Sequence, residues 1–384
     1  MLNTDTTVVI GAGQAAARCA LELRRLGYAG RVVLVGNEST PPYQRPELSK
    51  SYLARSASPD EVVMLTPTMA ADHGIELNLG AAVEQVDLSQ RQVCVAGEQI
   101  AFDKLVFATG GQALTRDGAL RLRTLSDADR LYQMLKHEQR LTVIGGGWLG
   151  LEVAATARSH GLEVRLFEQN DRLCARSVPD EISAVLLAHQ QRIGVEVNLG
   201  SNPDEDTLDS DIICACIGIS PNTHLAESAG VEVDRGIIVN DRQMTSAPNV
   251  FAIGDCARPA GQPALENWAY ANVSAERAAH AICDIALPLA ADLWLWSKQG
   301  DLLIQKRGDF AGAEETIVRR KGKSTCYFYL RDKRLACCIA INDTAQFGQS
   351  RALFRSQRQL DLTALADTRL PLKSVGISQV TAVG

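Results

Sequence analysis

The chain has 384 residues, of which 46% are hydrophobic and 22% are charged, and this composition excludes a disordered or low-complexity protein. Its length suits two or three domains, and its formal net charge of −6 argues against nucleic acid as a partner of the whole chain. Because no apolar run is long enough to span a membrane and no signal peptide is recognisable, we expect a cytoplasmic protein.

The chain opens with a predicted strand, a glycine-rich turn, a helix and a second strand. Thr7–Ile10 is a β-branched run, Gly11–Ala16 reads GAGQAA, and the strand Arg31–Val35 leads to Glu38. In a dinucleotide-binding unit the first glycine makes the turn, the second lets the backbone approach a pyrophosphate, and the third position keeps helix and strand close. The helix N-terminus attracts the phosphates, and the carboxylate accepts hydrogen bonds from a ribose. This order of elements predicts a nucleotide site.

A second unit with the same plan starts about 134 residues later. Leu141–Ile144 precedes Gly145–Gly150, which reads GGGWLG, and the strand Glu163–Phe167 ends at Glu168. Two such units suggest two dinucleotides held close together, a bound flavin and a diffusing nicotinamide coenzyme. A carboxylate at Glu168 favours a free 2′-hydroxyl over a 2′-phosphate, so NADH is favoured, with NADPH left open by Arg172.

The later segments indicate that the first domain is split and that a third domain follows. Three buried runs end in small or acidic residues: Leu105–Gly110, Ile212–Gly218 and Val250–Asp255. From Trp294 the pattern changes to alternating strands, expected at residues 302–305, 317–319, 326–330 and 335–341, with helical sequence from about Ala345. We predict an α/β fold with two Rossmann-like dinucleotide-binding domains, the first interrupted by the second, and a C-terminal α+β domain. The expected boundaries are 1–111 and 237–290, 112–236, and 291–384.

Several short motifs occur in an order typical of one group of flavoproteins. They are Pro41–Lys50 (PPYQRPELSK), Leu122–Leu125 with Asp127, Gly146–Glu152 (GGWLGLE), Gly254–Ala257 (GDCA), Glu266–Trp268 (ENW) and Trp296–Gln299 (WSKQ). Together they resemble the ferredoxin reductases of Rieske-type aromatic-ring dioxygenase systems and of related cytochrome P450 systems, within the glutathione-reductase-like superfamily.

The resemblance implies FAD in the first site and NADH in the second. Hydride would pass to the flavin, and single electrons would then pass to a [2Fe-2S] ferredoxin that feeds an aromatic-ring oxygenase. The residues it implies around FAD are Gly11, Gly13, Ala16, Glu38, Arg45, Lys50, Val83, Arg123, Gly254, Asp255, Trp268 and Val273. Those it implies around NADH are Gly145, Gly147, Gly150, Glu152, Glu168 and Gly218. The catalytic residues expected nearest the isoalloxazine are Lys50, Trp268 and Trp296, and no metal site is expected.

The residue types support some of these roles and leave simpler ones open for others. Arg45 and Lys50 lie in a loop with three prolines, where cations can balance the charge of a pyrophosphate or of a reduced flavin. Asp255 could cap a helix, a role that is compatible with binding the cofactor, and Trp268 and Trp296 could simply pack in the core.

The sequence also departs from the family's pattern. Glu47 stands where the family has a second proline, and the short segment 200–210 predicts a trimmed hairpin in the NADH domain. Disulfide reductases of the superfamily use a CxxxxC pair beside the flavin, but Pro41–Lys50 contains no cysteine, so no dithiol relay is expected. The adjacent Cys337 and Cys338 would point to opposite faces of a strand, which disfavours a bridge between them.

The charge is unevenly distributed. Residues 291–384 contain 15 Lys or Arg and 9 Asp or Glu, a charge of +6, which leaves −12 for the rest. Two basic groups stand out: Arg319, Arg320, Lys321 and Lys323, and then Arg331, Lys333 and Arg334. They could be solvated turns, or a docking face for an acidic iron–sulfur protein, because electrostatic steering suits a partner that binds and leaves fast.

The sequence therefore predicts an FAD-dependent NADH:ferredoxin oxidoreductase. Two alternatives stay open. One is an NADH oxidase or quinone-type reductase of the same fold, and the other is a flavin-binding protein whose reduction changes its assembly.

Overall fold

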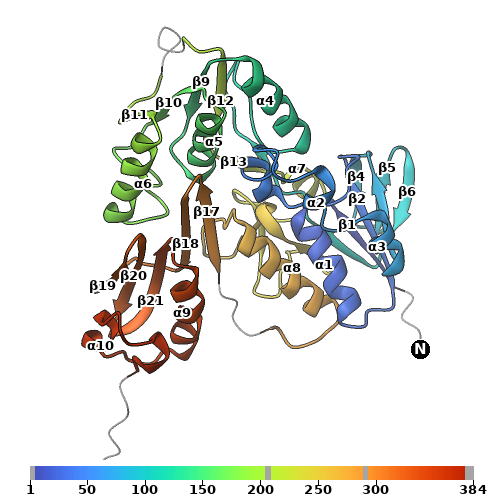
Figure 1. The fold of residues 1–384 in the computed structure, drawn as a ribbon. Coiled ribbons are helices and arrows are strands. Elements are labelled where there is room, and N and C mark those ends of the chain that lie inside the picture. The colour runs from blue at the N-terminus through green and yellow to red at the C-terminus, as the bar shows by residue number, and fades with distance from the viewer. Residues whose placement is uncertain (1–4, 204–208, 289–292, 377–384) are drawn as a thin grey trace, which may run out of the picture. The chain divides into compact units, whose positions relative to one another are not determined.

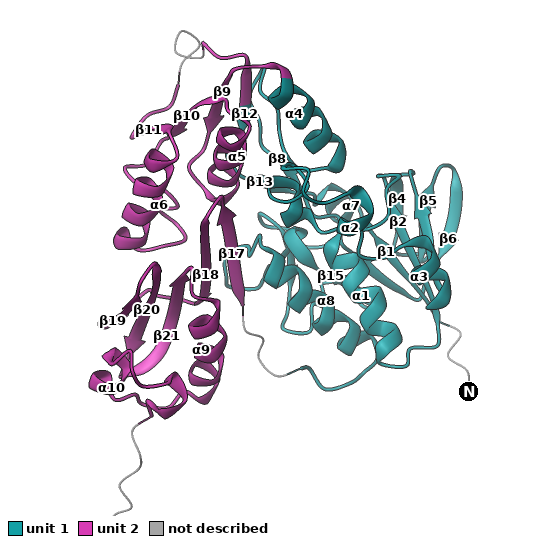
Figure 2. Cartoon of the chain, viewed as in Figure 1, with its two compact units in different colours: residues 1–136, 214–291 teal, residues 137–213, 292–384 magenta. Residues whose placement is uncertain are grey.

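The computed structural model describes residues 5–203, 209–288 and 293–376, which form two compact units (Figures 1 and 2). Unit 1 comprises residues 1–136 and 214–291, and unit 2 comprises residues 137–213 and 292–384. The first nucleotide-binding fold is thus interrupted in the chain by the second, as predicted. The finer division into three domains stays a prediction, and the trimmed hairpin expected at 200–210 lies largely on residues 204–208, outside the described residues.

Unit 1 is built on a parallel sheet with the strand order β15-β7-β1-β2-β3. Its strands are β1 (Thr6–Ile10), β2 (Arg31–Gly36), β3 (Ile75–Leu79), β7 (Lys104–Phe107) and β15 (Val250–Ala252). The central strands are continuous apolar runs and are buried, which is typical of a parallel sheet covered on both faces. The carboxyl ends of all five strands lie at one edge, where such folds bind ligands.

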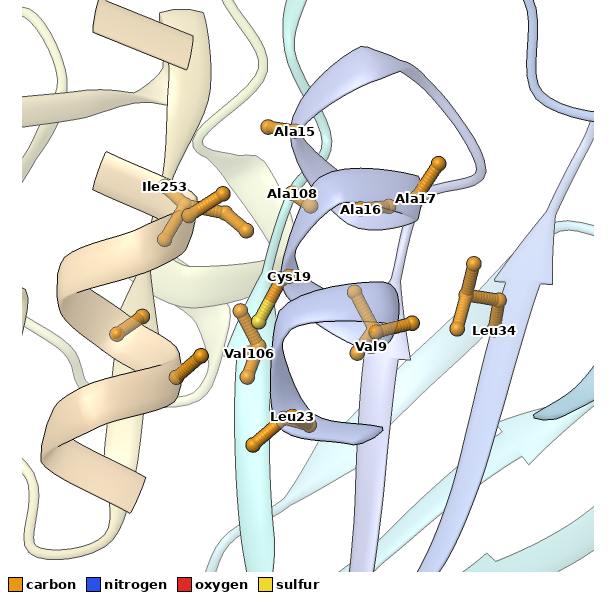
Figure 3. Packing of buried hydrophobic residues seen from close by; sticks show 14 of the residues in the cluster. Val9, Ala15, Ala16, Ala17, Cys19, Leu23, Leu34, Val106, Ala108 and Ile253 are labelled. Atoms are coloured by element: carbon orange, nitrogen blue, oxygen red, sulfur yellow. The ribbon is translucent and has the colours of Figure 1, made fainter. Parts of the chain in front are cut away.

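Two long helices of unit 1 pack closely because their contact faces consist of small residues. They are α1 (Gln14–Arg25) and α8 (Trp268–Ile282), and the hydrophobic core that they share contains the buried alanines Ala15, Ala16, Ala17 and Ala20 of α1 and Ala271, Ala275, Ala278 and Ala279 of α8. Figure 3 shows α1 lying across the sheet, with Cys19 and Leu23 beside Val9 and Val106. This packing fixes the N-terminus of α1 over the end of β1.

The remaining elements of unit 1 are short. The helical ones are η1 (Arg45–Ser49), α2 (Pro59–Val62), α3 (Pro67–Asp72), α4 (Leu125–His137, which ends at the unit boundary), α7 (His224–Ser228) and η2 (Gly254–Cys256). An antiparallel sheet joins β4 (Val83–Asp87), β5 (Gln92–Val95) and β6 (Glu98–Ala101). Two strand pairs complete the unit, β8 (Gly111–Ala113) with β13 (Ile219–Pro221) and β14 (Ile237–Val239) with β16 (Ala257–Pro259).

Unit 2 begins with the second nucleotide-binding fold. Its sheet has the order β11-β10-β9-β12, with β9 (Arg140–Ile144), β10 (Glu163–Glu168), β11 (Val195–Leu199) and β12 (Ile212–Ala215). The helices α5 (Trp148–Ser159) and α6 (Asp180–Arg192) pack against it. The predicted order of strand, glycine turn, helix and strand is confirmed in both folds.

The C-terminal part of unit 2 is the predicted α+β region. Its antiparallel sheet has the order β17-β18-β21-β20-β19, with β17 (Trp294–Gln299), β18 (Leu302–Gly308), β19 (Glu315–Lys321), β20 (Ser324–Arg331) and β21 (Arg334–Ile341). The helical elements that follow are α9 (Thr344–Ser356), α10 (Leu362–Ala366) and η3 (Leu372–Ser374). Among the described helices of the whole chain, none combines the length and the hydropathy that a membrane span requires.

The close packing of α1 on α8 gives a stability prediction. Ala275 is fully buried in that contact, so Ala275→Leu should lower the free energy of unfolding by about 1–3 kcal/mol through overpacking. Ala71→Leu, on the exposed side of α3, is the matched control and should change it by less than about 0.5 kcal/mol. Denaturant unfolding measures both values, and an unchanged midpoint for Ala275→Leu would contradict this account of the packing.

Candidate functional site

The first glycine turn closes so tightly that its first residue must lack a side chain. Gly11 has φ +124°, and a Cβ there would lie 2.1 Å from the carbonyl oxygen of Ala108. The N–H of Gly11 donates to the oxygen of Val35 at 2.7 Å, which ties the turn to the end of β2. Gly13 is the N-cap of α1 and no side chain caps the helix, so its first N–H groups are directed at any ligand in the turn. Ala16 is fully buried between helix and strand, as the third position of the motif requires.

A guanidinium group lies beside this turn. Nη2 of Arg45 is 3.8 Å from where a Cβ on Gly13 would be, and it donates to Oε1 of Glu38 at 2.6 Å. The Tyr43 hydroxyl donates to Oε2 of Glu38, also at 2.6 Å. Although burial favours a neutral Arg45, Tyr43 and Glu38 raise its pKa, so it stays a cation. Burial raises the pKa of Tyr43 as well, which keeps its hydroxyl a neutral donor. The structure thus fixes the predicted carboxylate at the end of β2 and places a positive charge by the helix N-terminus.

The predicted Asp255 and Arg123 contact each other directly. Nη2 of Arg123 and Oδ2 of Asp255 form an ion pair of 2.8 Å. A Cβ on Gly254 would lie 3.0 Å from the Cβ of Ala15, so this pair adjoins the start of α1. Asp255 lies inside η2, while the cap of α8 is Asn267, so the reading of Asp255 as a helix cap is wrong. Asp255 is therefore positioned at the sheet edge and held there by an arginine.

The remaining expected flavin residues are half-buried in unit 1. Lys50 follows η1 and donates from Nζ to the carbonyl oxygen of Pro46 at 3.1 Å. Trp268 is the first residue of α8, Val273 lies one turn further, and Val83 begins β4. Their common role at a flavin stays a prediction.

Gln14 is a residue that the sequence reasoning missed. Its Nε2 donates to Oδ1 of Asn272 at 3.0 Å, while its buried Oε1 accepts no hydrogen bond from the described residues. A buried amide oxygen without a donor is costly, so the arrangement suits a ligand with a hydroxyl or N–H group at this turn. Its position inside the GAGQAA motif was the available signal. The uncapped helix, the cation at Arg45 and this oxygen all fit a dinucleotide such as FAD.

The second glycine turn repeats the first in unit 2. Gly145 has φ +107° and donates to the oxygen of Phe167 at 2.8 Å. A Cβ on Gly150 would lie 1.9 Å from the carbonyl oxygen of Gly145, so helix and strand are in contact there. Gly147 is the N-cap of α5 without a side-chain cap, and a Cβ on it would meet nothing within 4 Å. There is thus no space for a side chain at Gly150, where the helix meets the strand, but there is free space at Gly147, where a pyrophosphate would approach.

The carboxylate at the end of β10 is fixed by the turn itself. Glu168 is buried, and its Oε2 accepts from the N–H of Gly146 at 2.7 Å while its Oε1 accepts from the N–H of Asn170 at 2.8 Å. Arg172 donates to the carbonyl oxygens of Val178 and Ala175 at 2.7 and 2.9 Å. Its guanidinium is thus committed to the backbone, which weakens the argument that it would bind a 2′-phosphate.

The other expected coenzyme residues belong to different units. Glu152 is buried in α5 and accepts from Oγ of Ser297 at 2.7 Å, within unit 2. Gly218 follows β12 in unit 1, is exposed, and has φ +112°. Trp296 lies on β17 of unit 2 with its ring centroid 5.2 Å from that of Trp294, a contact that suits packing.

The fold and the two turns agree with comparisons to known proteins. Residues 5–275 match the family described as pyridine nucleotide-disulphide oxidoreductase. The chain belongs to this family. Residues 294–376 match a second description, reductase C-terminal, which accounts for the α+β region. Membership of this family, together with relatives named as ferredoxin–NAD(+) reductases, implies that the cofactors are FAD and NADH.

Relatives within the family agree over their full length. The p-cumate 2,3-dioxygenase system ferredoxin–NAD(+) reductase component of Pseudomonas putida is 34% identical, covering 96% of this chain and 98% of the relative. Putidaredoxin reductase of Pseudomonas putida is 31% identical over 98% of this chain and 97% of the relative. Among solved structures, the covalent putidaredoxin reductase–putidaredoxin complex superimposes with a TM-score of 0.89 at 31% identity, covering 96% of this chain and 97% of that one.

The cysteines of this oxidoreductase do not form a disulfide centre. All ten are free, and no CxxxxC pair occurs in the loop before Lys50. Burial raises the pKa of both Cys19 and Cys337 to about 12, so these thiols are protonated and unreactive at neutral pH.

The basic groups of the C-terminal region are arranged differently from the expectation. Arg319 is 3% exposed and donates to the carbonyl oxygens of Asp367 and Leu370, so its inclusion in a docking face is wrong. Arg319 lies on the edge strand β19, and its side chain is directed into the protein, where it donates hydrogen bonds to these carbonyl oxygens. The two groups also lie at opposite ends of β20, about 23 Å apart along an eight-residue strand, and do not form one patch.

Gly147 and Gly150 of the second turn differ in the space available for a side chain, and this difference gives a prediction. Gly147→Ala should leave the thermal midpoint of the protein unchanged, because its Cβ meets open space, but should weaken NAD⁺ binding roughly tenfold by filling the space that a pyrophosphate needs. Gly150→Ala should destabilise the fold by about 2–3 kcal/mol, because its Cβ collides with a backbone oxygen. Calorimetry of both variants checks this, and equal effects on stability would contradict it.

Proposed function

We propose that the protein oxidises NADH and passes the electrons singly to a [2Fe-2S] ferredoxin that supplies an aromatic-ring oxygenase. The observation that carries this proposal is the pair of uncapped glycine turns in a chain whose C-terminal region matches that of the reductase components. Relatives of this length are named as reductases of dioxygenase systems, and the solved complex pairs one of them with putidaredoxin.

The first site is proposed to hold FAD through unit 1. When bound, FAD accepts a hydride and releases electrons one at a time. The N–H groups at the start of α1 and the Arg45 guanidinium would bind the pyrophosphate, and Glu38 would accept from the adenosine ribose. Asp255, oriented by Arg123, would accept from the ribityl chain. The charged groups are held in pairs, Arg45 with Glu38 at 2.6 Å and Arg123 with Asp255 at 2.8 Å, so the fold itself orients them.

The second site is proposed to bind NADH reversibly. The N-terminus of α5 would bind its pyrophosphate, and Glu168 would accept from the adenosine ribose. Glu152 would accept a hydrogen bond from the nicotinamide half, because a carboxylate is an acceptor only and the carboxamide offers N–H donors. Lys50 and Trp268 of unit 1 would lie near the flavin ring, and the expected role of Trp296 in unit 2 stays a prediction.

The electron acceptor is proposed to dock at the basic β19–β20 turn. Arg320, Lys321 and Lys323 are exposed there, and among the described residues no side-chain hydrogen bond or ion pair of these three is found. In the second basic group, Arg331 and Arg334 instead donate to backbone carbonyls. Exposed cations of this kind would speed the approach of an acidic ferredoxin at low ionic strength.

A cytoplasmic location is part of this proposal. Ten free thiols suit a reducing compartment, where they persist without pairing.

Two alternative functions differ from this proposal in their electron acceptor. An NADH oxidase would pass the electrons to oxygen, and a flavin-binding interaction protein would turn over slowly with every acceptor.

Turnover measured with different electron acceptors distinguishes these functions. Anaerobic NADH should bleach the bound flavin rapidly, and steady-state turnover with a [2Fe-2S] ferredoxin should exceed turnover with oxygen alone by about 100-fold, because only the ferredoxin docks. Added salt should slow the ferredoxin reaction without slowing the bleaching. Fast NADH oxidation with oxygen alone would establish an oxidase. A protein that stays colourless with FAD would overturn the proposal.

Coenzyme choice gives a second prediction. Glu168→Gln removes the charge that would repel a 2′-phosphate, so the ratio of kcat/KM for NADH over NADPH should fall roughly tenfold. Glu163→Gln, an exposed change at the start of the same strand, is the control and should leave the ratio unchanged. Wild-type protein that uses NADPH as well as NADH would show that Glu168 does not select the coenzyme.

A further inference from the structure

We propose that β17 of the C-terminal region supplies two positioning residues to the NADH site, Ser297 and Gln299, which orient the carboxylate of Glu152. The inference rests on the proposed role of Glu152 toward the nicotinamide half. It assigns to this strand a part in coenzyme binding in addition to any part in docking the acceptor.

The two residues are placed by strand alternation. Side chains two positions apart on a strand share a face, so Ser297 and Gln299 point to one side of β17 while Trp296 and Lys298 point to the other. Ser297 is fully buried and Gln299 is 1% exposed. Their face of β17 contacts α5, the helix that carries Glu152.

A continuous chain of buried hydrogen bonds runs through this contact. Nε2 of Gln190 donates to the carbonyl oxygen of Leu151 at 3.1 Å and to Oε1 of Gln299 at 2.8 Å. Nε2 of Gln299 donates to Oγ of Ser297 at 3.1 Å. Oγ of Ser297 donates to Oε1 of Glu152 at 2.7 Å.

The direction of this chain is fixed by its chemistry. A serine hydroxyl has one proton, and the Gln299 amide already donates into one of its lone pairs, so the proton of Ser297 is available for Glu152. Donation to a carboxylate oxygen sets the plane of the carboxyl group. Reversing any link would place two donors or two acceptors face to face inside the protein, which is costly.

The backbone of Gln299 is held as well. Burial lowers the pKa of His189, so this histidine is neutral at pH 7. Its Nε2 lies 2.8 Å from the carbonyl oxygen of Gln299, and its Nδ1 lies 3.0 Å from Nη2 of Arg192. An arginine can only donate, so Nδ1 accepts and Nε2–H donates to Gln299. Arg192 is itself paired with Asp301 at 2.6 Å. Hydrogen bonds therefore fix both the backbone carbonyl and the side-chain amide of Gln299 in a single orientation.

Polar groups this deeply buried are not needed to hold a strand against a helix. Apolar residues of the same size would pack there without the cost of satisfying an amide, a hydroxyl and a carboxylate. The network ends on the one carboxylate of α5 that the coenzyme proposal uses. We therefore infer that its function is to present Glu152 in a fixed orientation.

Binding of two coenzyme fragments tests this inference. In the FAD-loaded protein, Ser297→Ala should raise the Kd for NAD⁺ roughly tenfold, because Oε1 of Glu152 loses the hydrogen bond from Ser297 that orients the carboxylate. The Kd for ADP-ribose, which lacks the nicotinamide, should stay within about twofold of wild type. Ser297→Thr keeps the hydroxyl and should restore most of the NAD⁺ affinity. Ser324→Ala is the matched control, since it removes a hydroxyl that donates to the Asn342 carbonyl in the same sheet, and should change neither Kd.

Gln299→Met provides a second variant that keeps the test informative if Ser297→Ala folds poorly. Removing the amide lets the Ser297 hydroxyl rotate, so the Kd for NAD⁺ should rise about threefold with ADP-ribose unaffected. Loss of affinity for NAD⁺ and ADP-ribose to the same extent in the folded variants, or no loss for either, would overturn the inference. Wild-type protein that binds neither compound would overturn the proposed function instead.

Discussion

Two turns of this protein have no room for a side chain, and each brings the start of a helix to the end of a strand. A Cβ on Gly11 or on Gly150 would lie about 2 Å from a backbone oxygen, closer than any atom can approach. Because those positions are empty, each helix starts directly at the end of its strand, and its unsatisfied N–H groups face the sheet edge. The alanines between α1 and α8 then hold the first helix in that position. Every proposed nucleotide contact begins from this geometry.

Around each turn, charged side chains are fixed by protein partners before any nucleotide arrives. Glu38 is held by Arg45 and Asp255 by Arg123, while Glu168 is held by the backbone of its own turn. Such preorganisation lowers the entropy cost of binding, which suits both a resident flavin and a coenzyme that must exchange at every turnover. The buried network from Gln190 to Glu152 extends the same principle to the C-terminal strand.

The local parts of this architecture could be predicted from the sequence, and the long-range parts could not. Both βαβ units follow from apolar runs and glycine spacing, because those signals lie within about 30 residues of each other. The contact of Ser297 with Glu152 joins residues 145 positions apart, and no local pattern specifies it. Arg319 belongs to a basic run, which predicts an exposed side chain. In the structure its guanidinium is buried because it donates to the carbonyl oxygens of Asp367 and Leu370, which are far along the chain. The orientation of the Gln14 amide is also a long-range feature, because its Nε2 donates to Asn272 of α8 and its Oε1 accepts no hydrogen bond from the described residues.

The two nucleotide sites are proposed to convert the two-electron donor NADH into single electrons for a ferredoxin. An anaerobic titration of NADH into the FAD-loaded protein with excess oxidised [2Fe-2S] ferredoxin measures this conversion. About two ferredoxins should be reduced for each NADH consumed, with the flavin returning to its oxidised absorbance. NADH consumption that leaves the ferredoxin oxidised would contradict it.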